Sequence, residues 1–268
     1  MKIRYEKKGP VAVFTLDNGK VNALTPPMHR QMFEHMRDFI ADREVRVGIL
    51  TGAGDRAFCG GDDIKHDWSY PTLHQTLDAH FWASDDDSGN GRPGWERELK
   101  QLERFKPIIA AVNGPCLGMG MIYLLSFSDI RIAVPHSFFG LPEIAYGMGG
   151  ASGTVQLGRH LPPTVALAMA LVGEPLSAED ALRHSLINEI VQPGALMTRA
   201  HDLAATIASH PPLAVRVEME TFYRGMDMTR RDSLAFATHL YRLQRATYLT
   251  GEGTSAAPLA DDAPERNR

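Results

Sequence analysis

The 268-residue sequence lacks the features that identify several large classes of protein. Its two cysteines, Cys59 and Cys116, are too few for a disulfide-stabilised fold and have no metal-ligand spacing. It has 28 lysines and arginines against 32 aspartates and glutamates, so it lacks the basic excess that nucleic acids and anionic membranes attract. No apolar run approaches the roughly 20 residues of a membrane span, and the N-terminus has no signal-peptide core. These absences favour a cytoplasmic protein that binds neither nucleic acid nor membrane.

Several catalytic motifs are missing as well. There is no G-x-S-x-G nucleophile elbow and no G-x-x-x-x-G-K-[ST] phosphate loop. Gly118 and Gly120 follow an expected strand as in a dinucleotide-binding turn, but Tyr123 stands where that turn needs its third glycine. The eleven histidines are scattered, without H-E-x-x-H, and most are expected on the surface or hydrogen-bonded in the interior. We therefore expect no metal site.

The composition that is present, 44% apolar and 22% charged residues, is typical of a globular protein. In the first half, β-branched and apolar runs predict strands that alternate with helices, whereas from residue 151 the pattern is helical almost throughout. This predicts an α/β core with a helical C-terminal portion. The expected strands are 11–16, 45–51, 108–112 and 130–134, and the expected helices are 26–41 and 119–127, followed by segments near 154–171, 177–184, 194–209, 212–224 and 229–250.

Residues 66–98 stand apart from this pattern. All three tryptophans of the chain, Trp68, Trp82 and Trp95, lie in this segment around a polar stretch that contains glycine. A long connection of this kind is either a substrate lid or a loosely packed surface insertion.

Two glycine-rich turns follow expected strands and place backbone N–H groups at their ends. Residues 57–64 follow the strand 45–51, and residues 113–120 follow the strand 108–112 and open the next helix. Such amides can hold a developing negative charge, although either turn alone is more often an ordinary tight turn. Glu143, after a proline in an apolar stretch, is a candidate general base or else a surface turn residue.

Taken together and in this order, these features resemble the crotonase (enoyl-CoA hydratase/isomerase) superfamily. The resemblance runs in register from about residue 3 to residue 225, and the combination is far more specific than any single motif. The matching segments are 20–24 (KVNAL), 49–64 (ILTGAGDRAFCGGDDI), 106–120 (KPIIAAVNGPCLGMG), 129–133 (DIRIA), 138–147 (FFGLPEIAYG) and 171–191 (LVGEPLSAEDALRHSLINEIV).

The resemblance implies an α/β fold, a crotonase-type spiral of ββα units with a helical C-terminal trimerisation region. On this basis, residues 1–195 form the spiral core with the active site, residues 196–250 the helical C-terminal region, and residues 251–268 a mobile tail. Members of the family usually assemble as trimers or dimers of trimers, so a homotrimer or a hexamer is expected here.

The resemblance also implies a coenzyme A thioester as substrate and no permanently bound cofactor. Two backbone N–H groups would polarise the thioester carbonyl and stabilise the enolate, and by position these belong to Gly60 and Met119. Lys65 is placed to reach a phosphate, or else is a solvated lysine. The other coenzyme A contacts are expected at Val21, Ala23, Leu24, Ala57, Cys59 and Gly61.

The sequence departs from the family pattern in ways that affect the chemistry. Hydratases of the family activate water with two glutamates; Glu143 matches the second, whereas the first would fall at Ile122, or at Tyr123 if the alignment shifts by one. Members with one glutamate are typically double-bond isomerases. Asp62 stands where the family usually has a small residue, and it is either a replacement acid or a solvent-facing side chain. If 66–98 is a lid, its tryptophans favour a bulky, cyclic or aromatic acyl group.

The resulting hypothesis is an acyl-CoA-processing enzyme with Glu143 as the single acid/base, in which double-bond isomerisation is favoured and hydration is possible. One alternative is a thioester or β-diketone C–C hydrolase or lyase that uses Asp62 or a histidine of the lid, namely His66, His74 or His80. Another alternative is a non-catalytic acyl-CoA-binding homologue.

Overall fold

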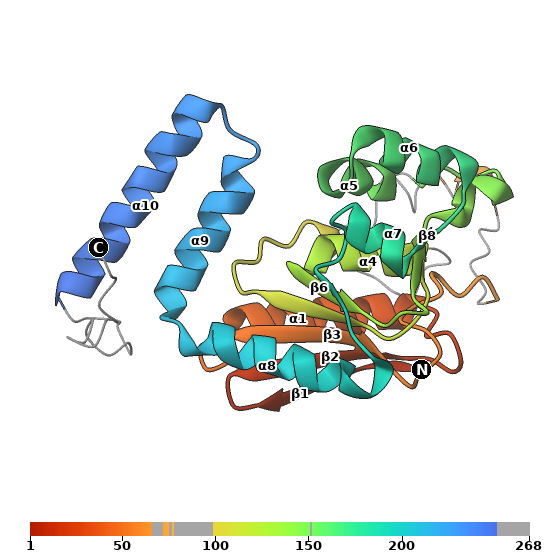
Figure 1. Ribbon diagram of the computed structural model, residues 1–268, viewed down its shortest axis with the longest axis horizontal. Coiled ribbons are helices and arrows are strands. Elements are labelled where there is room, and N and C mark those ends of the chain that lie inside the picture. Colours follow the sequence, from red (N-terminus) through yellow and green to blue (C-terminus); the bar gives the residue numbers. More distant parts are fainter. Residues whose placement is uncertain (66–71, 75–76, 78–98, 151, 251–268) are drawn as a thin grey trace. The chain divides into compact units, whose positions relative to one another are not determined.

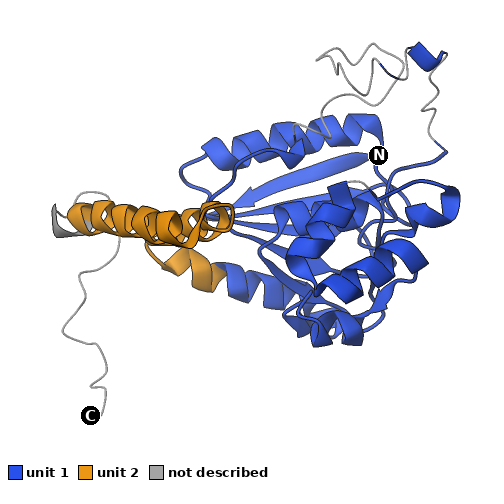
Figure 2. Cartoon of the chain, turned by 90° about the horizontal axis from the view of Figure 1, so that it is seen from above, with its two compact units in different colours: residues 1–204 blue, residues 205–268 orange. Residues whose placement is uncertain are grey.

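The computed structural model describes residues 1–65, 72–74, 77, 99–150 and 152–250 (Figure 1). The predicted lid, except for 72–74 and 77, and the predicted tail 251–268 lie outside the described residues. The chain forms two compact units, residues 1–204 and 205–268 (Figure 2). The division lies inside helix α8 (Leu196–Ser209), whereas the predicted boundary between 195 and 196 lies at the start of that helix.

A six-stranded sheet forms the centre of the first unit. Its strands, in spatial order, are β1 (Lys2–Lys8), β2 (Val11–Asp17), β3 (Val47–Gly52), β4 (Ile108–Val112), β6 (Ile130–Ala133) and β9 (Glu189–Ile190). β1 pairs antiparallel with β2, and the other neighbouring pairs are parallel. β3 and β4 are buried along their whole length, as parallel strands covered on both faces must be, and their sequences VGILTG and IIAAV are correspondingly apolar.

Helix α1 (Pro26–Ala41) packs against this sheet and confirms the helix predicted at 26–41. It begins at two prolines, which suit a first turn because the N–H groups that they lack would have no acceptor there. Phe39 meets Phe14 of β2 edge-on, with 5.5 Å between ring centroids. The buried face of α1 consists of Met28, His29, Met32, Met36 and Phe39, so one of its members is polar.

A second layer of short elements follows β4 along the chain. Helix α4 (Met119–Phe127) is buried on nearly all sides, in agreement with its uniformly apolar sequence MGMIYLLSF. β5 (Cys116–Leu117), β7 (Phe138–Gly140) and β8 (Leu176–Ser177) form a three-stranded sheet. The other elements of this layer are η1 (Pro142–Tyr146), α5 (Ser152–His160), α6 (Pro163–Val172) and α7 (Ala178–Arg183), whereas η2 (Pro193–Ala195) follows β9 and precedes α8.

The second unit contains the end of α8 and a hairpin of α9 (Pro212–Gly225) and α10 (Arg230–Thr250). Several of its large apolar side chains are exposed, among them Phe222, Leu234, Tyr241 and Leu243. Throughout the described residues, each helix is too short or too polar to cross a lipid bilayer.

Two elements differ from the predictions. The segment predicted as one helix near 154–171 forms two, α5 and α6, because Pro162 and Pro163 interrupt the backbone hydrogen bonds between them. β1 has no counterpart among the predicted strands. Of its seven residues KIRYEKK only Ile3 is buried, so the strand lacks the apolar alternation by which strands are identified and instead has the lysines typical of a sheet edge.

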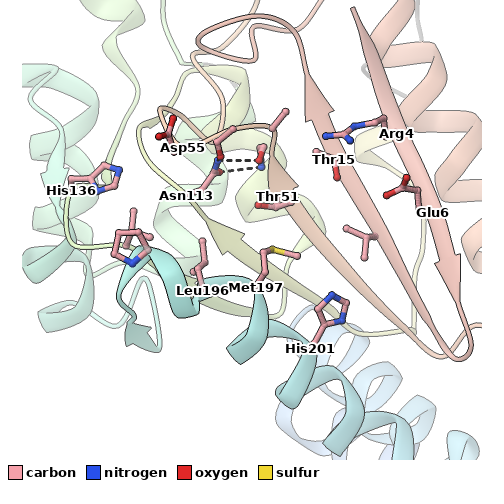
Figure 3. A pocket seen from close by; sticks show the side chains of 16 residues that line it. Arg4, Glu6, Thr15, Thr51, Asp55, Asn113, His136, Leu196, Met197 and His201 are labelled. Carbon is pink, nitrogen blue, oxygen red and sulfur yellow. Dashed lines mark hydrogen bonds between the residues drawn. The ribbon is translucent and has the colours of Figure 1, made fainter.

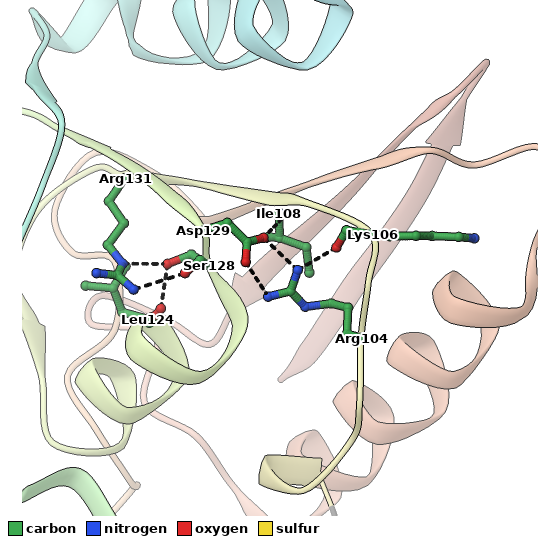
Figure 4. Close-up of polar contacts among 7 residues, drawn as sticks. All are labelled: Arg104, Lys106, Ile108, Leu124, Ser128, Asp129 and Arg131. Atoms are coloured by element: carbon green, nitrogen blue, oxygen red, sulfur yellow. Dashed lines mark hydrogen bonds and ion pairs between the residues drawn. The ribbon is translucent and has the colours of Figure 1, made fainter. Parts of the chain in front are cut away.

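A buried ion pair connects the second layer to the central sheet (Figure 4). Both terminal nitrogens of Arg104 donate to the carboxylate of Asp129, at 2.6 and 3.1 Å. The backbone N–H of Ile108, at the start of β4, donates to the same carboxylate at 2.7 Å. The Arg104 side chain is 8% exposed, so water cannot replace Asp129 as its partner without local opening.

We expect the substitution Asp129→Asn to lower the free energy of unfolding by about 3 kcal/mol, because it leaves the buried guanidinium of Arg104 without a counter-charge. Urea denaturation measures the change. The control, Glu34→Gln, removes an exposed ion pair with Arg30 and is expected to cost less than about 1 kcal/mol. If both variants lost the same free energy of unfolding, the buried ion pair would stabilise the fold no more than an exposed one does.

Candidate active site

The two predicted glycine turns lie side by side at the carboxyl ends of the parallel strands β3 and β4. The N–H of Cys59 donates to Pro115 O at 3.1 Å, and the N–H of Leu117 donates to Cys59 O at 2.9 Å. Gly120 packs so closely that a Cβ there would lie 2.5 Å from the Cβ of Cys59. Glycine at 120 therefore lets the N-terminal end of α4 contact the first turn. In open parallel sheets this edge is the usual place for ligands.

The predicted coenzyme A loop, residues 21–24, pairs with the other side of the first turn. The hydrogen bonds run from Gly60 N–H to Val21 O (2.8 Å), from Leu24 N–H to Gly61 O (2.8 Å) and from Asp63 N–H to Leu24 O (2.7 Å). Three segments that are far apart in sequence thus form one continuous backbone ladder.

The seven predicted coenzyme A contacts differ in exposure. Leu24, Ala57, Cys59 and Gly61 are buried, Ala23 is half-buried, and Val21 and Lys65 are exposed. The buried members can therefore offer a ligand only backbone groups. Burial also raises the pKa of the Cys59 thiol to about 12, so this cysteine is no thiolate nucleophile near neutral pH.

The two amides predicted to bind an oxyanion differ in their hydrogen bonding. Met119 is the first residue of α4, where an N–H has no acceptor within the helix and the helix dipole adds positive potential. The N–H of Gly60, by contrast, is already engaged with Val21 O. Gly60 is thus not placed as the sequence predicted, because its amide points to the coenzyme A loop.

The N–H of Asp62, two residues after Gly60, points away from the 21–24 loop. Gly61 O and Asp63 N–H both bond to Leu24, and in a parallel ladder the residue between two such groups directs its own N–H to the opposite edge. Gly61 lies beside Met119, since a Cβ on Gly61 would be 3.5 Å from the Met119 nitrogen. The first turn therefore contributes a differently oriented amide on the side of α4, one that sequence reasoning missed.

Glu143, in η1, lies against the second glycine turn. A Cβ on Gly118 would be 3.0 Å from Oε1 of Glu143. The other oxygen, Oε2, is buried and has no hydrogen-bond partner among the described residues. Burial raises the pKa of Glu143, the negative charge of Asp62 raises it further, and a hydrogen bond from its own backbone opposes both effects. The predicted general base is thus a partly buried carboxyl group beside a second carboxylate.

We expect Gly118→Ala to lower turnover about tenfold or more, because a methyl group at 118 would displace the carboxylate of Glu143 and because the φ of +54° is strained for alanine. Steady-state kinetics on the purified variant measures the effect. Gly158→Ala is the control, since a Cβ at that position in α5 meets no atom within 4 Å. An unimpaired Gly118→Ala enzyme would contradict the placement of Glu143.

The Asp62 carboxylate is held by two residues that were not predicted for the site. Oδ1 of Asp62 lies 3.0 Å from Nε2 of His29, and Nδ1 of His29 lies 2.6 Å from the hydroxyl oxygen of Tyr123. The side chains of His29 and Asp62 are 3% and 15% exposed, and Tyr123 is completely buried. A histidine on the apolar face of a predicted helix was the available signal for this network, but its partners are distant in sequence.

The two positions at which the family pattern would place the first glutamate, Ile122 and Tyr123, supply no carboxylate to the site. Ile122 is 5% exposed, and its Cγ1 lies 3.1 Å from the position of a Cβ on Gly153 in α5. Ile122 is thus an apolar side chain that packs between α4 and α5. Tyr123 contributes its hydroxyl group to His29.

A pocket of about 390 Å³ lies elsewhere, between β1–β3 and α8 (Figure 3). Its lining includes Thr51, Asn113, His136 and His201 and contains none of the residues predicted for the site. Asn113 bonds both N–H and C=O of Gly52, at 3.1 and 3.0 Å, and so fixes the loop that leads from β3 to the first glycine turn. The lining of this pocket includes neither Asp62 nor Glu143, so the pocket is distinct from the candidate site.

The described residues contain no group of three or more histidines, cysteines, aspartates or glutamates that could hold a metal ion. Of the lid histidines considered in the hydrolase alternative, His74 is exposed, and His66 and His80 lie outside the described residues.

Comparison with known proteins gives one family. The model of the enoyl-CoA hydratase/isomerase family matches residues 6–255. The (E)-benzylidenesuccinyl-CoA hydratase of Thauera aromatica is 34% identical over 258 residues, covering 96% of this chain and 95% of the relative. The short-chain-enoyl-CoA hydratase of Clostridium acetobutylicum is 35% identical over 238 residues, covering 88% and 86%. A crystal structure of an enoyl-CoA hydratase from Bacillus anthracis superposes with a TM-score of 0.79 at 26% identity, covering 96% and 99%.

These matches confirm the predicted crotonase-type α/β fold, since they extend over nearly the whole of both chains. The chain belongs to the enoyl-CoA hydratase/isomerase family, whose members act on coenzyme A thioesters.

Proposed function

We propose that this chain catalyses the reversible addition of water to the α,β double bond of an enoyl-CoA thioester. The observation that carries the proposal is that two acidic residues, Asp62 and Glu143, meet at the second glycine turn. A Cβ on Gly118 would lie 3.0 Å from Oε1 of Glu143 and 3.5 Å from the Cα of Gly61, the residue before Asp62. The sequence favoured isomerisation because Ile122 supplies no second carboxylate. Asp62 supplies one from a different loop. The names of the relatives from Thauera aromatica and Clostridium acetobutylicum, both hydratases, agree with this proposal.

The oxyanion of the enolate would be bound by the N–H groups of Met119 and Asp62. The first stands at a helix N-terminus, and the second is directed away from the coenzyme A loop. This pairing replaces the predicted pairing of Met119 with Gly60, whose amide is engaged with Val21. Loss of one such donor typically costs about 3 kcal/mol of transition-state stabilisation.

In the hydration direction, the carboxylate of Asp62 accepts a proton from water while the water oxygen bonds to Cβ. The electron pair of the double bond moves toward the thioester carbonyl and is held there by the two amides. Glu143 then donates its proton to Cα and completes the 3-hydroxyacyl product. A raised pKa suits this acid role, because more of Glu143 is protonated near neutral pH. Dehydration runs the same steps in reverse.

The proposed coenzyme A contacts and the proposed oligomer are those that membership of the family implies. Val21 and Lys65 are the exposed side chains among the predicted coenzyme A contacts, and the others would bind through the backbone. A homotrimer or dimer of trimers would cover the exposed apolar side chains of α9 and α10, such as Phe222 and Tyr241. A cytoplasmic location and the absence of a permanently bound cofactor stay predictions.

The identity of the acyl group also stays a prediction, because the three tryptophans of the segment 66–98 lie outside the described residues. One relative is named for an acyl group that carries a benzylidene substituent. A panel of linear and aromatic enoyl-CoA thioesters tests the predicted preference for bulky, cyclic or aromatic groups, and fastest turnover of short linear chains would contradict it.

Isotope labelling tests the proposed reaction directly. The enzyme is incubated with a 2-enoyl-CoA in H₂¹⁸O, and mass spectrometry follows the product. Hydration adds one ¹⁸O atom at Cβ and leaves the thioester intact. Release of free thiol would instead support the hydrolase alternative, and no reaction beyond binding would support the non-catalytic alternative.

Isomerisation is the second candidate function. Oε2 of Glu143 is buried and has no hydrogen-bond partner in the part of the chain that the structure describes. This favours isomerisation, because one carboxylate can carry a proton from Cα to Cγ without help. Conversion of a 3-enoyl-CoA into a 2-enoyl-CoA without incorporation of ¹⁸O would support this function over hydration.

A further inference from the structure

Behind Asp62 lies a chain of two buried polar side chains that come from different helices. His29 belongs to α1, Tyr123 belongs to α4, and Asp62 lies in the first glycine turn. The distances of 3.0 Å from Asp62 to His29 and 2.6 Å from His29 to Tyr123 are those of good hydrogen bonds. Ring contacts restrain the geometry further, since Tyr123 meets His29 and Phe127 edge-on at 5.6 and 4.8 Å.

The proton positions in this chain follow from what each group can donate. An ionised carboxylate only accepts, so Nε2 of His29 must carry the hydrogen that Asp62 receives. In the neutral imidazole, Nδ1 is then an acceptor, and the hydroxyl of Tyr123 donates to it. With His29 in this neutral tautomer, both hydrogen bonds run in one direction, from Tyr123 through His29 to Asp62. Both ring nitrogens of His29 have a hydrogen-bond partner, so the orientation of the imidazole is fixed at both ends.

We propose that His29, held by Tyr123, positions the Asp62 carboxylate beside Glu143, so that Asp62 can serve as the second carboxylate for water. The inference rests on the proposed hydration function and deepens it. His29 and Tyr123 are positioning residues in this scheme, because their contacts reach the reacting atoms only through Asp62.

Comparing two activities of each variant, hydration and α-proton exchange, distinguishes a positioning role of His29 from a general contribution to folding. Hydration of an enoyl-CoA needs Asp62, Glu143 and the oxyanion amides. Exchange of the α-proton of butyryl-CoA in D₂O needs Glu143 and the amides but not the activation of water. We expect His29→Leu to lower kcat for hydration by about tenfold to a hundredfold, while KM and the exchange rate change less than about threefold.

A conservative series strengthens the test. Tyr123→Phe removes one hydroxyl group and keeps the ring, so it should lower hydration by a smaller factor of about threefold to tenfold. His29→Gln keeps an N–H donor for Asp62 and should recover part of the rate that His29→Leu loses. His35→Gln is the control, because His35 lies on the same helix and bonds Ile3 O outside the site.

The outcomes distinguish this inference from the function on which it rests. Hydration that falls while exchange is retained, with partial recovery in His29→Gln, supports the positioning role. Equal loss of both activities, or unchanged hydration in His29→Leu, would overturn the inference and leave the proposed function standing. A wild-type enzyme that exchanges the α-proton but adds no water would overturn both.

Discussion

The variant Glu143→Gln is expected to lose hydration activity by about 10³-fold in kcat, with little change in the affinity for coenzyme A thioesters. Such a loss corresponds to about 4 kcal/mol of transition-state stabilisation. The amide has nearly the shape of the carboxyl group and fits beside Gly118, but it cannot donate a proton to Cα or remove one. Binding is spared because the predicted coenzyme A contacts lie on the loops around Val21 and Lys65.

Stopped-assay kinetics and a titration with a saturated acyl-CoA measure the two effects separately. Because Glu143 also removes the α-proton, exchange in D₂O should be lost together with hydration. The control Glu179→Gln changes an exposed carboxylate in the first turn of α7 that has no part in the proposed mechanism, and it should behave as the wild type. Unchanged turnover in Glu143→Gln would remove Glu143 from the mechanism, whatever the function of the chain.

The same substitution should leave stability equal or improved at alkaline pH. Burial raises the pKa of Glu143 in the folded state above its value in the unfolded chain. The stability that belongs to the neutral form is thus fully present below the unfolded pKa and is lost as pH rises through the folded pKa. Glutamine stays neutral throughout, so the free energy of unfolding of the variant should decline less than that of the wild type over this window. A variant that is inactive but no less stable shows that the carboxyl group is present for chemistry.

The sequence could predict the elements that bring the site together because their signals are local. The apolar runs of β3 and β4, the glycines that end them and the proline start of α1 each lie within a few residues of the structure that they specify. Glu143 was predicted as the acid/base in the same way, from the residues around it, and this role stays a prediction. These parts of the prediction are independent of how distant segments pair.

The orientation of the oxyanion amides could not be predicted, because it depends on a distant strand. Which of the N–H groups between 59 and 63 points toward α4 is decided by the hydrogen bonds that Gly60 and Gly61 make with the segment 21–24. The resemblance assigned the oxyanion role to Gly60, two residues before the amide that the ladder directs away from the 21–24 loop.

The contacts of His29 could not be predicted from the sequence for a related reason. Its partners, Asp62 and Tyr123, are 33 and 94 residues away in sequence. A histidine among the methionines of α1 is expected to be a buried residue with its hydrogen bonds satisfied, and His29 is such a residue. Its connection to the site exists only after α1, the first glycine turn and α4 have packed together.

The variant Asp62→Asn is expected to lower kcat for hydration by about 10²-fold to 10³-fold while α-proton exchange continues. Asparagine can still accept the hydrogen bond from Nε2 of His29, and its backbone N–H is unchanged, so the variant removes the charge of Asp62 and keeps the geometry. Asp63→Asn is the matched control, because Asp63 is the adjacent carboxylate and its Oδ1 accepts the Lys65 N–H at an exposed turn.

The pH dependence of the remaining exchange reaction gives a second, independent readout. The negative charge of Asp62 raises the pKa of Glu143, so its removal should lower that pKa. Exchange requires ionised Glu143, and its acidic limb should therefore move to lower pH in Asp62→Asn and stay in place in Asp63→Asn. A shift without loss of hydration would mean that the two carboxylates interact but that Asp62 does not activate water. Equal loss of hydration and exchange would instead assign the effect to the oxyanion amide, since Asp62 provides both a side chain and a backbone donor to the same site.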